Sequence, residues 1–259
     1  MNPVDLIKSF LIVCLVFIPF ERVLAFHPGQ KIFRRGWATD LIHVVATRFL
    51  VLLGTLLLFA LCLALLEGLV PKSVRAAVAA QPFFLAFLEV LLIADIGFYL
   101  AHRAFHAFPL LWKFHSVHHS TREMDFLAAF RVHPVDQILI RSATLLPVFA
   151  LGFAPEVILF WMVLYRWHSL LVHSNVRIGF GPLRRIIALP VFHHWHHADH
   201  PEAVDKNFAG QLPLLDLLFG TLHLPQGGMP EKYGIDVPVP GSYLGQLSYP
   251  FKGAWSVSA

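Results

Sequence analysis

Charge is the first thing this sequence lacks. Of its 259 residues, 14% are charged and 57% are hydrophobic, whereas a soluble domain typically has about 25% charged and about 45–50% apolar residues. The deficit indicates an integral membrane protein. The net charge is only +4, and the Lys and Arg residues lie between apolar runs. They form no stripe of the kind that binds nucleic acid, and a role in holding loops on the cytoplasmic side fits them better.

Cysteines and the common catalytic motifs are also scarce or absent. The two cysteines, Cys14 and Cys62, both lie in apolar runs, so we infer neither a disulfide nor a thiolate metal site. The sequence has no H-E-x-x-H, G-x-S-x-G or G-x-x-x-x-G-K, which removes the most common protease, esterase and nucleotide-binding interpretations. No linker or repeat divides the chain. We therefore expect one integral membrane domain, residues 1–259.

Long apolar runs are what the sequence has instead. A run of 22 residues at 1.5 Å per residue is long enough to cross a hydrocarbon core of about 30 Å. The runs cover residues 6–20, 49–70, 82–101 and 135–172. Gly152 and Pro155 break the last run into a hairpin of two helices. The first run has no A-x-A-like cleavage site, so we expect a retained span. These features predict an all-α, polytopic membrane bundle of about four to five spans.

The positively charged residues predict the orientation of the spans. The short loop after the first run, residues 22–35, is the most basic one and is therefore expected on the cytoplasmic side. Following the chain from there places every histidine-rich stretch on that same side, with Lys72 and Arg75 as exceptions on the outer side. The sequence thus predicts a His-rich helical cap on the cytoplasmic face of the bundle.

Histidine is the residue in excess, with 16 in the chain. Most fall in three boxes: HRAFH, HSVHH and HHWHH. The first has two histidines at i and i+4, which share one helix face, and the other two boxes share the spacing H-x-x-H-H. The histidines at these spacings are His102, His106, His115, His118, His119, His193, His196 and His197. Isolated histidines have a simpler interpretation, as exposed or hydrogen-bonded side chains: His27, His43, His200 and His223.

Three boxes on one side of a membrane predict a metal centre, because unpaired imidazoles near lipid are costly. Imidazole suits Zn, Cu, Fe and Ni, and no thiolate is available. A structural zinc needs only four ligands, so eight to ten histidines are too many for one ion and suit two. The soluble di-iron bundles use Glu ligands and a Glu-x-x-His pattern, which is absent here.

The boxes and the segments around them resemble a known family. DIGFYLAHRAFH, HSVHH, VHSN and HHWHH, the last followed by DKNF and LFGT, are similar to the fatty acid hydroxylase / sterol desaturase superfamily over residues 95–221. The resemblance implies a catalytic region with two histidine-bound irons that activates O2 and hydroxylates or desaturates a C–H bond of a lipid, such as a sterol or a fatty acyl chain. It also implies an external electron donor, ferredoxin-like or cytochrome b5-like.

The resemblance also implies a ligand set. Its members are His102, His106, His115, His118, His119, His173, His193, His196 and His197, while His133, His168 and His194 match the family pattern less closely. His173 lies outside the boxes, at the expected end of the returning hairpin helix. His27-Pro28-Gly29 resembles a haem-binding H-P-G-G, but Gln30 replaces the last Gly and no domain of cytochrome b5 size surrounds it, so we expect no fused haem domain.

One carboxylate near the first box has two interpretations. Asp95 lies seven residues before His102, on the same helix face. It either orients an imidazole, as metal-bound histidines require, or makes a helix–helix hydrogen bond in the membrane. Asp205 and Asn207, after the third box, are expected to support that loop.

Two other functions compete with the oxygenase. A membrane zinc metallohydrolase would need about three ligands per ion, a general base and no O2. A metal transporter or storage protein would place histidines inside the spans, along a path, whereas these lie at the ends of spans. Loss of activity without O2 separates the oxygenase from both.

Overall fold

Helices form nearly all of the regular structure. The computed structural model describes residues 3–178, 181–226 and 228–252. Within these ranges the chain forms no strand, and its two β-bridges are isolated pairs, Ala25 with Val176 and Ala198 with Tyr233. The all-α prediction is confirmed.

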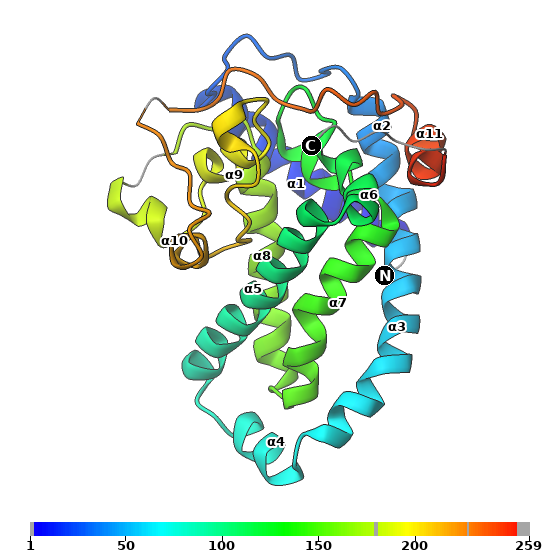
Figure 1. Cartoon of the computed structure of the whole chain (residues 1–259), viewed down its shortest axis with the longest axis vertical. Helices are drawn as coiled ribbons and strands as arrows, with labels where there is room; N and C mark the ends of the chain where they lie inside the picture. Colours follow the sequence, from blue (N-terminus) through cyan, green and yellow to red (C-terminus); the bar gives the residue numbers. More distant parts are fainter. Residues whose placement is uncertain (1–2, 179–180, 227, 253–259) are drawn as a thin grey trace.

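Five long helices correspond to the apolar runs of the sequence. They are α1 (Pro3–Val23), α3 (Arg48–Leu69), α5 (Phe83–Ala107), α7 (Pro134–Leu151) and α8 (Pro155–His173). The predicted hairpin lies between the last two, because Gly152 follows α7 with a left-handed φ of 81° and Pro155 begins α8. The amphipathic helix α4 (Lys72–Ala79) joins α3 to α5 at the far end of the molecule (Figure 1).

Three helical segments in the described part of the chain are long and apolar enough to cross a membrane. They are Trp37–Leu63, Phe83–Ala107 and Pro134–Leu151. The first joins α2 (Trp37–Ile42), a π-helical turn (His43–Thr47) and most of α3. Helices α1 and α8 are not among the three, so the expected count of four to five spans is not confirmed. Leucines on α3 such as Leu57, Leu61 and Leu65 are largely exposed, as side chains that face lipid would be.

Helix α7 is the centre of the bundle and packs on α3 and α5. Two glycines allow these helices to come close. A Cβ added at Gly97 of α5 would collide with the backbone carbonyl of Ala143 on α7, and one at Gly54 of α3 would collide with the side chain of Ile138. The close approach of α5 to α7 matters for the site, because both helices contribute to it.

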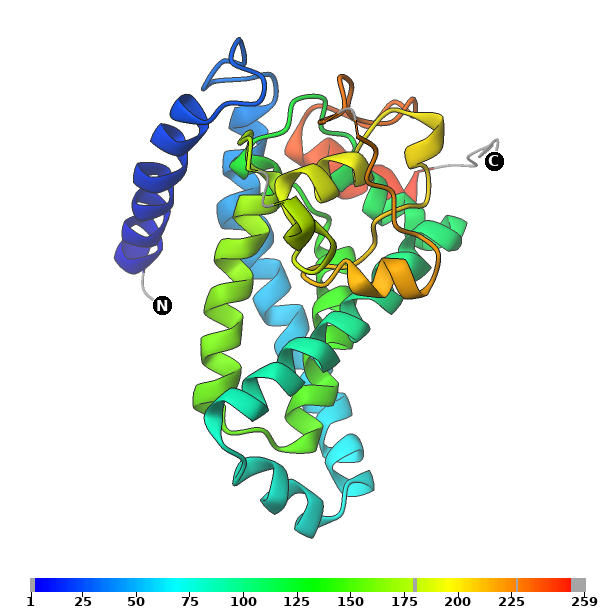
Figure 2. The same ribbon diagram turned by 90° about the vertical axis from the view of Figure 1, so that its left-hand side faces the viewer.

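The upper part of the molecule is a cap of short helices and loops (Figure 1). It contains α6 (Pro109–His119), α9 (Pro190–His196), α10 (Leu214–Leu218), α11 (Tyr243–Ser248) and four 3-10 turns (Phe126–Phe130, Gly181–Arg185, Pro201–Ala203 and Tyr249–Phe251). Helix α1 lies at the edge of the molecule (Figure 2). It contacts the cap through Phe10 and Phe17, which pack near Phe126 and Phe130. The last turns of α5 and α8 reach the cap, so their histidines meet those of α6 and α9.

Candidate metal centre

Nine histidines form two groups in the cap. Within each group the ligand nitrogens lie within 4.8 Å of one another. The first group contains His102, His106, His115, His119 and His196, and the second contains His118, His173, His193 and His197. These are the nine residues that the boxes and the family resemblance predicted as ligands, and eight of them are buried, with His106 partly so.

Each group takes histidines from more than one box. Both histidines of the first box belong to the first group. In the second box the outer two belong to the first group and the middle one, His118, to the second. The third box reverses this: its middle histidine, His196, belongs to the first group and the outer two to the second. Residues i and i+4 share a helix face. In the second and third boxes, the outer two histidines therefore face one group and the middle histidine faces the other.

The loop after the third box holds two imidazoles of the first group. Asp205 and Asn207 both have left-handed backbones, with φ of 55° and 61°, a conformation that Asp and Asn adopt more readily than most residues. This geometry turns the loop back toward the histidines. Two of its carbonyl oxygens accept hydrogen bonds from ligand imidazoles: Phe208 from His102 Nδ1 at 2.7 Å and Lys206 from His196 Nδ1 at 2.7 Å.

Two carboxylates hold further imidazoles of the first group. Asp136, buried in the first turn of α7, accepts a hydrogen bond from His115 Nδ1 at 3.0 Å. Asp205 lies 3.3 Å from His106 Nδ1, and its side chain is 63% exposed. An imidazole that donates Nδ1–H to a carboxylate keeps a lone pair on Nε2 and becomes a more basic ligand.

The second group is supported differently. His118 Nδ1 donates to the carbonyl of Arg131 at 3.0 Å, and His173 Nδ1 donates to the carbonyl of Ser169 at 2.7 Å. Within the described part of the chain, no carboxylate forms a hydrogen bond with an imidazole of this group.

The arrangement of nitrogens fits bound cations. His102 and His115 both donate through Nδ1, so their Nε2 atoms, 3.0 Å apart, both present lone pairs. The same holds for His118 and His173, whose Nε2 atoms are 3.2 Å apart. With no proton between them the two lone pairs repel each other unless a cation lies nearby. Nitrogens about 2.1 Å from one ion and at a right angle would be about 3.0 Å apart.

Further nitrogens of the groups are buried without a partner among the described residues. They are Nε2 of His106, His119 and His196, and Nδ1 of His197. Burial also lowers the pKa of His115 to about 3 and that of His118 to about 4. Both imidazoles are therefore neutral at pH 7, as a metal ligand must be.

Comparison with known proteins places the chain in a family. The profile described as "Fatty acid hydroxylase" matches residues 87–221. The chain belongs to the fatty acid hydroxylase family, as the boxes had suggested. The match begins on α5 before the first box and ends just beyond the loop that follows the third box, so it includes every histidine of both groups.

Several relatives of this chain are named as hydroxylases or monooxygenases of lipids. Ornithine lipid hydroxylase OlsE of Rhizobium tropici is 34% identical over 162 residues, which are 62% of this chain and 49% of that protein. Alkylglycerol monooxygenase of Danio rerio is 33% identical over 143 residues, 55% of this chain and 31% of that protein. A putative methylsterol monooxygenase of Dictyostelium discoideum is 26% identical over 208 residues, 79% of this chain and 75% of that protein.

The matched region spans about half the length of the ornithine lipid hydroxylase and about a third of the alkylglycerol monooxygenase. No solved structure gives a significant match.

The three histidines that matched the family pattern less closely lie outside both groups. Each forms a hydrogen bond with a backbone carbonyl through Nε2: His133 with Leu247, His168 with Ala188, and His194 with His173 and Ser174. His133 also begins α7, because its Nδ1 accepts from the N–H of Val135. His194 supports the end of α8 next to His173.

Asp95 anchors the loop beneath the first group. Its carboxylate accepts the backbone N–H groups of Gly210, Gln211 and Leu212, at 2.9, 2.9 and 2.7 Å, and in the described part of the chain it forms no hydrogen bond with an imidazole. Asp216 accepts from the next two N–H groups toward the box, those of Phe208 and Ala209. The two aspartates therefore fix the loop whose carbonyls orient His102 and His196.

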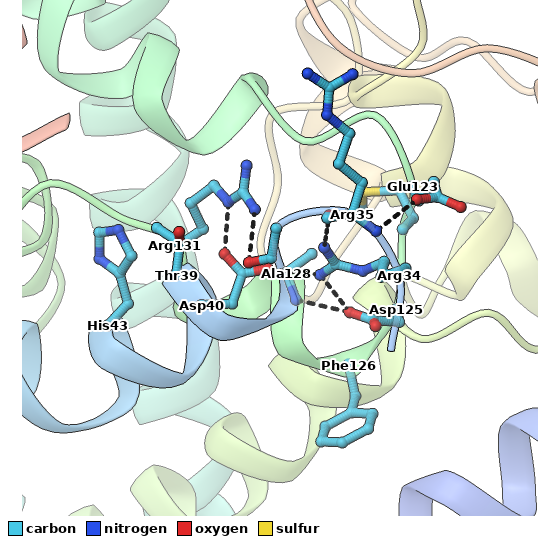
Figure 3. Close-up of polar contacts among 12 residues, drawn as sticks. Arg34, Arg35, Thr39, Asp40, His43, Glu123, Asp125, Phe126, Ala128 and Arg131 are labelled. Carbon is cyan, nitrogen blue, oxygen red and sulfur yellow. Dashed lines mark hydrogen bonds and ion pairs between the residues drawn. The ribbon is translucent and has the colours of Figure 1, made fainter. Parts of the chain in front are cut away.

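A buried ionic network supports the second group, and no motif in the sequence predicted it. Arg34 donates to Asp40 at 2.7 Å and to Asp125 at 2.6 Å, while Asp40 also accepts from Arg131 at 2.5 Å (Figure 3). The side chains of Arg34 and Asp40 are fully buried. Two cations and two anions balance, and the network fixes the backbone of Arg131, whose carbonyl accepts from His118. Asp136 was missed as well.

A cavity of about 560 Å³ adjoins both groups. His102 and His115 of the first group line it, as do His118, His173 and His193 of the second. Its other walls come from α1, α3, α7 and α8 and are largely apolar. A volume of this size is in the range of ligand sites.

Proposed function

We propose that the chain is an integral membrane di-iron oxygenase that hydroxylates or desaturates a C–H bond of a lipid, with O2 as co-substrate and electrons from an external donor. The observation that carries the proposal is the pair of histidine groups with converging Nε2 lone pairs on the wall of an apolar cavity. The family membership and the names of its relatives support it.

The first group would hold one iron with five imidazoles, and the second would hold the other with four. Bound iron would supply the reduction of O2 and the removal of hydrogen from an unactivated C–H bond. The residues of the chain would do the rest. Carbonyl and carboxylate acceptors fix the imidazole tautomers, and the apolar walls take the hydrocarbon part of the substrate and exclude water.

Placement in the membrane is also part of the proposal. One membrane domain, residues 1–259, would carry a catalytic region at 95–221, with the histidine boxes on the cytoplasmic face. A lipid would then enter from the bilayer while a ferredoxin-like or cytochrome b5-like donor docks from water. Accessibility labelling of cysteines placed at positions 120 and 198 tests the orientation, and labelling from opposite sides would refute it.

The central test uses isotopically labelled O2. Membranes containing the full chain, prepared under iron-replete conditions and supplied with a reductant system, are expected to convert a membrane lipid only when O2 is present. The label is expected in a hydroxylated lipid, or in water if an alkene forms. Product formation at an unchanged rate without O2 would contradict the proposal and favour a metallohydrolase.

Metal analysis provides a second test. Two ions per chain are expected, with iron in the active protein. Zinc can replace iron during purification, because the Irving–Williams order does not favour ferrous iron. A content of one ion or none after iron-replete preparation would contradict the two-ion proposal.

A further inference from the structure

Three arginines line the same cavity as the histidines. Arg48 is the first residue of α3, Arg141 lies on α7 and Arg166 lies on α8. The three helices bring them to one cavity from positions far apart in the sequence. A charged side chain at the depth of the membrane costs free energy, and such residues usually mark a functional site.

These arginines have no acidic partner in the described part of the chain. The half-buried guanidinium of Arg166 lies 4.4 Å from the centroid of the Phe130 ring, a cation–π contact that leaves its charge without a counter-ion. One carboxylate lines the cavity, that of Asp136. One of its oxygens accepts from His115, and the other is buried with no hydrogen-bond partner, so none of the three arginines binds it.

The buried arginines of the cap have carboxylate partners. Arg34 and Arg131 are buried in the cap, and each forms ion pairs with Asp40 or Asp125. Of the cavity arginines, Arg141 and Arg166 are half-buried and Arg48 is exposed, and within the described residues none has such a carboxylate. Three guanidinium groups that share one cavity without a carboxylate partner point to an anion supplied from outside the chain.

Their position along the helices relates them to the histidines. Arg166 lies seven residues before His173 on α8, and Arg141 lies five residues after Asp136 on α7, which correspond to about 10 Å and about 8 Å along the helix axes. Two apolar residues of α8 that line the cavity, Met162 and Leu159, lie farther from His173 than Arg166 does. Arg141 and Arg166 thus lie between the histidine end of the cavity and its apolar end.

We propose that Arg48, Arg141 and Arg166 bind the anionic group, a carboxylate or a phosphate, of the lipid that the cavity receives. Guanidinium groups bind both anions in bidentate fashion, and the apolar walls would take the hydrocarbon part. This inference rests on the proposed function, because it names the class of lipid that the same site would oxidise: an anionic amphiphile and not a neutral one.

A binding measurement without turnover tests this. The full chain, loaded with iron and placed in nanodiscs of phosphatidylcholine, is titrated anaerobically with radiolabelled hexadecyl phosphate and, separately, with hexadecanol. The wild type is expected to bind the phosphate at least about 10-fold more tightly, a difference of about 1.4 kcal/mol. The double variant Arg141→Gln/Arg166→Gln should lose that preference and keep its affinity for hexadecanol. Arg185→Gln is the control, because Arg185 is exposed and lies outside the cavity. It makes the same charge change per site and should keep the preference for the phosphate.

Several results would overturn the inference. Equal binding of phosphate and alcohol by the wild type would do so, as would an unchanged preference in the double variant. Displacement of hexadecyl phosphate by an equal concentration of inorganic phosphate would indicate a site for the free ion and not for an amphiphile. If the double variant does not fold, Arg166→Lys serves instead. It retains the charge without the bidentate fork, so a preference reduced by several-fold is expected and an unchanged one would count against the proposal.

The assay also separates this inference from the proposed function. It needs neither O2 nor electrons, so the head-group preference can be present or absent whatever the outcome with labelled O2. Metal content of the variants is measured in parallel, and two ions per chain are expected in each, because none of the arginines belongs to either histidine group.

Discussion

The two histidine groups lie side by side, yet their surroundings differ. The first has five imidazoles, and two of these donate to carboxylates, Asp136 and Asp205. The second has four imidazoles, and the two whose Nδ1 partners are defined donate to backbone carbonyls, those of Arg131 and Ser169. The carboxylates make the first group the stronger electron donor. The second group has fewer ligands, so a bound ion there would have more room for an exogenous ligand.

The largest effect is expected from a change that removes a ligand of the smaller group. His173→Ala leaves three imidazoles in the second group, so the metal content should fall from two ions per chain toward one and lipid oxidation should fall to background. The expected loss exceeds the roughly 10- to 100-fold loss of metal affinity or activity that follows removal of a hydrogen-bond partner of a ligand. His223→Ala, outside both groups, should keep both ions. Full metal content and normal turnover in His173→Ala would show that eight ligands suffice.

The next largest effect is expected at the buried carboxylate of the first group. Asp136→Asn removes the negative charge beside His115 and should weaken metal binding in the first group by about 10- to 100-fold, with the second group unchanged. Metal content at buffered ferrous ion concentrations, with Mössbauer spectra to distinguish the sites, measures this. Asp199→Asn is a surface control, since the side chain of Asp199 forms an exposed pair with Arg122 at 3.8 Å. Equal loss from both groups would mean that the two are not supported independently.

A change in the ionic network should act on the second group through the backbone. Asp40→Asn leaves Arg131 without its carboxylate, and loss of a buried ion-pair partner lowers the free energy of unfolding by about 3–5 kcal/mol. Because the network reaches His118 through the backbone carbonyl of Arg131, we expect a smaller change in metal affinity in the second group than Asp136→Asn causes in the first. Denaturant titration and metal analysis measure the two quantities. Glu123→Gln is the control, because Glu123 is an exposed neighbour whose carboxylate accepts from the backbone N–H of Arg35. It should change neither the stability nor the metal content. Unchanged stability in Asp40→Asn would contradict the role of the network.

The smallest effect is expected at the second carboxylate of the first group. Asp205 is 63% exposed and lies 3.3 Å from His106, so water screens its charge and competes for the hydrogen bond. Asp205→Asn should therefore weaken metal binding several-fold at most, less than Asp136→Asn does in the same assay. A loss equal to or larger than that of Asp136→Asn would mean that burial does not set the strength of these partners.

Local patterns in the sequence were enough to predict the helices and the histidines. The apolar runs predicted the five long helices, and Gly152 with Pro155 predicted the hairpin. The i and i+4 spacing predicted that His102 and His106 share a helix face, and the repeated H-x-x-H-H spacing marked the other two boxes. Spacing could not predict how the histidines divide into two groups, because that depends on how α6 and α9 are placed against α5, which is a property of the tertiary structure.

The supporting residues were harder to predict for the same reason. Asp136 contacts a histidine 21 positions earlier in the chain, and its only local signal is an acidic residue at the start of an apolar helix, after RVHP. Asp95 lies on the same helix as His102, α5, but its hydrogen-bond partners are N–H groups at positions 210–212. The Arg34–Asp40 network joins segments about 90 residues apart and has no sequence motif.

The mixing of boxes between the two groups has a consequence for how the protein matures in a cell. An ion in the first group would join residue 102 to residue 196, and a link between segments so far apart in the chain removes much conformational freedom from the unfolded state. Metal binding free energy at such a site becomes folding free energy. Iron supply would therefore govern how much intact protein accumulates as well as how fast each molecule works, with the cap of iron-starved molecules the first part open to proteases.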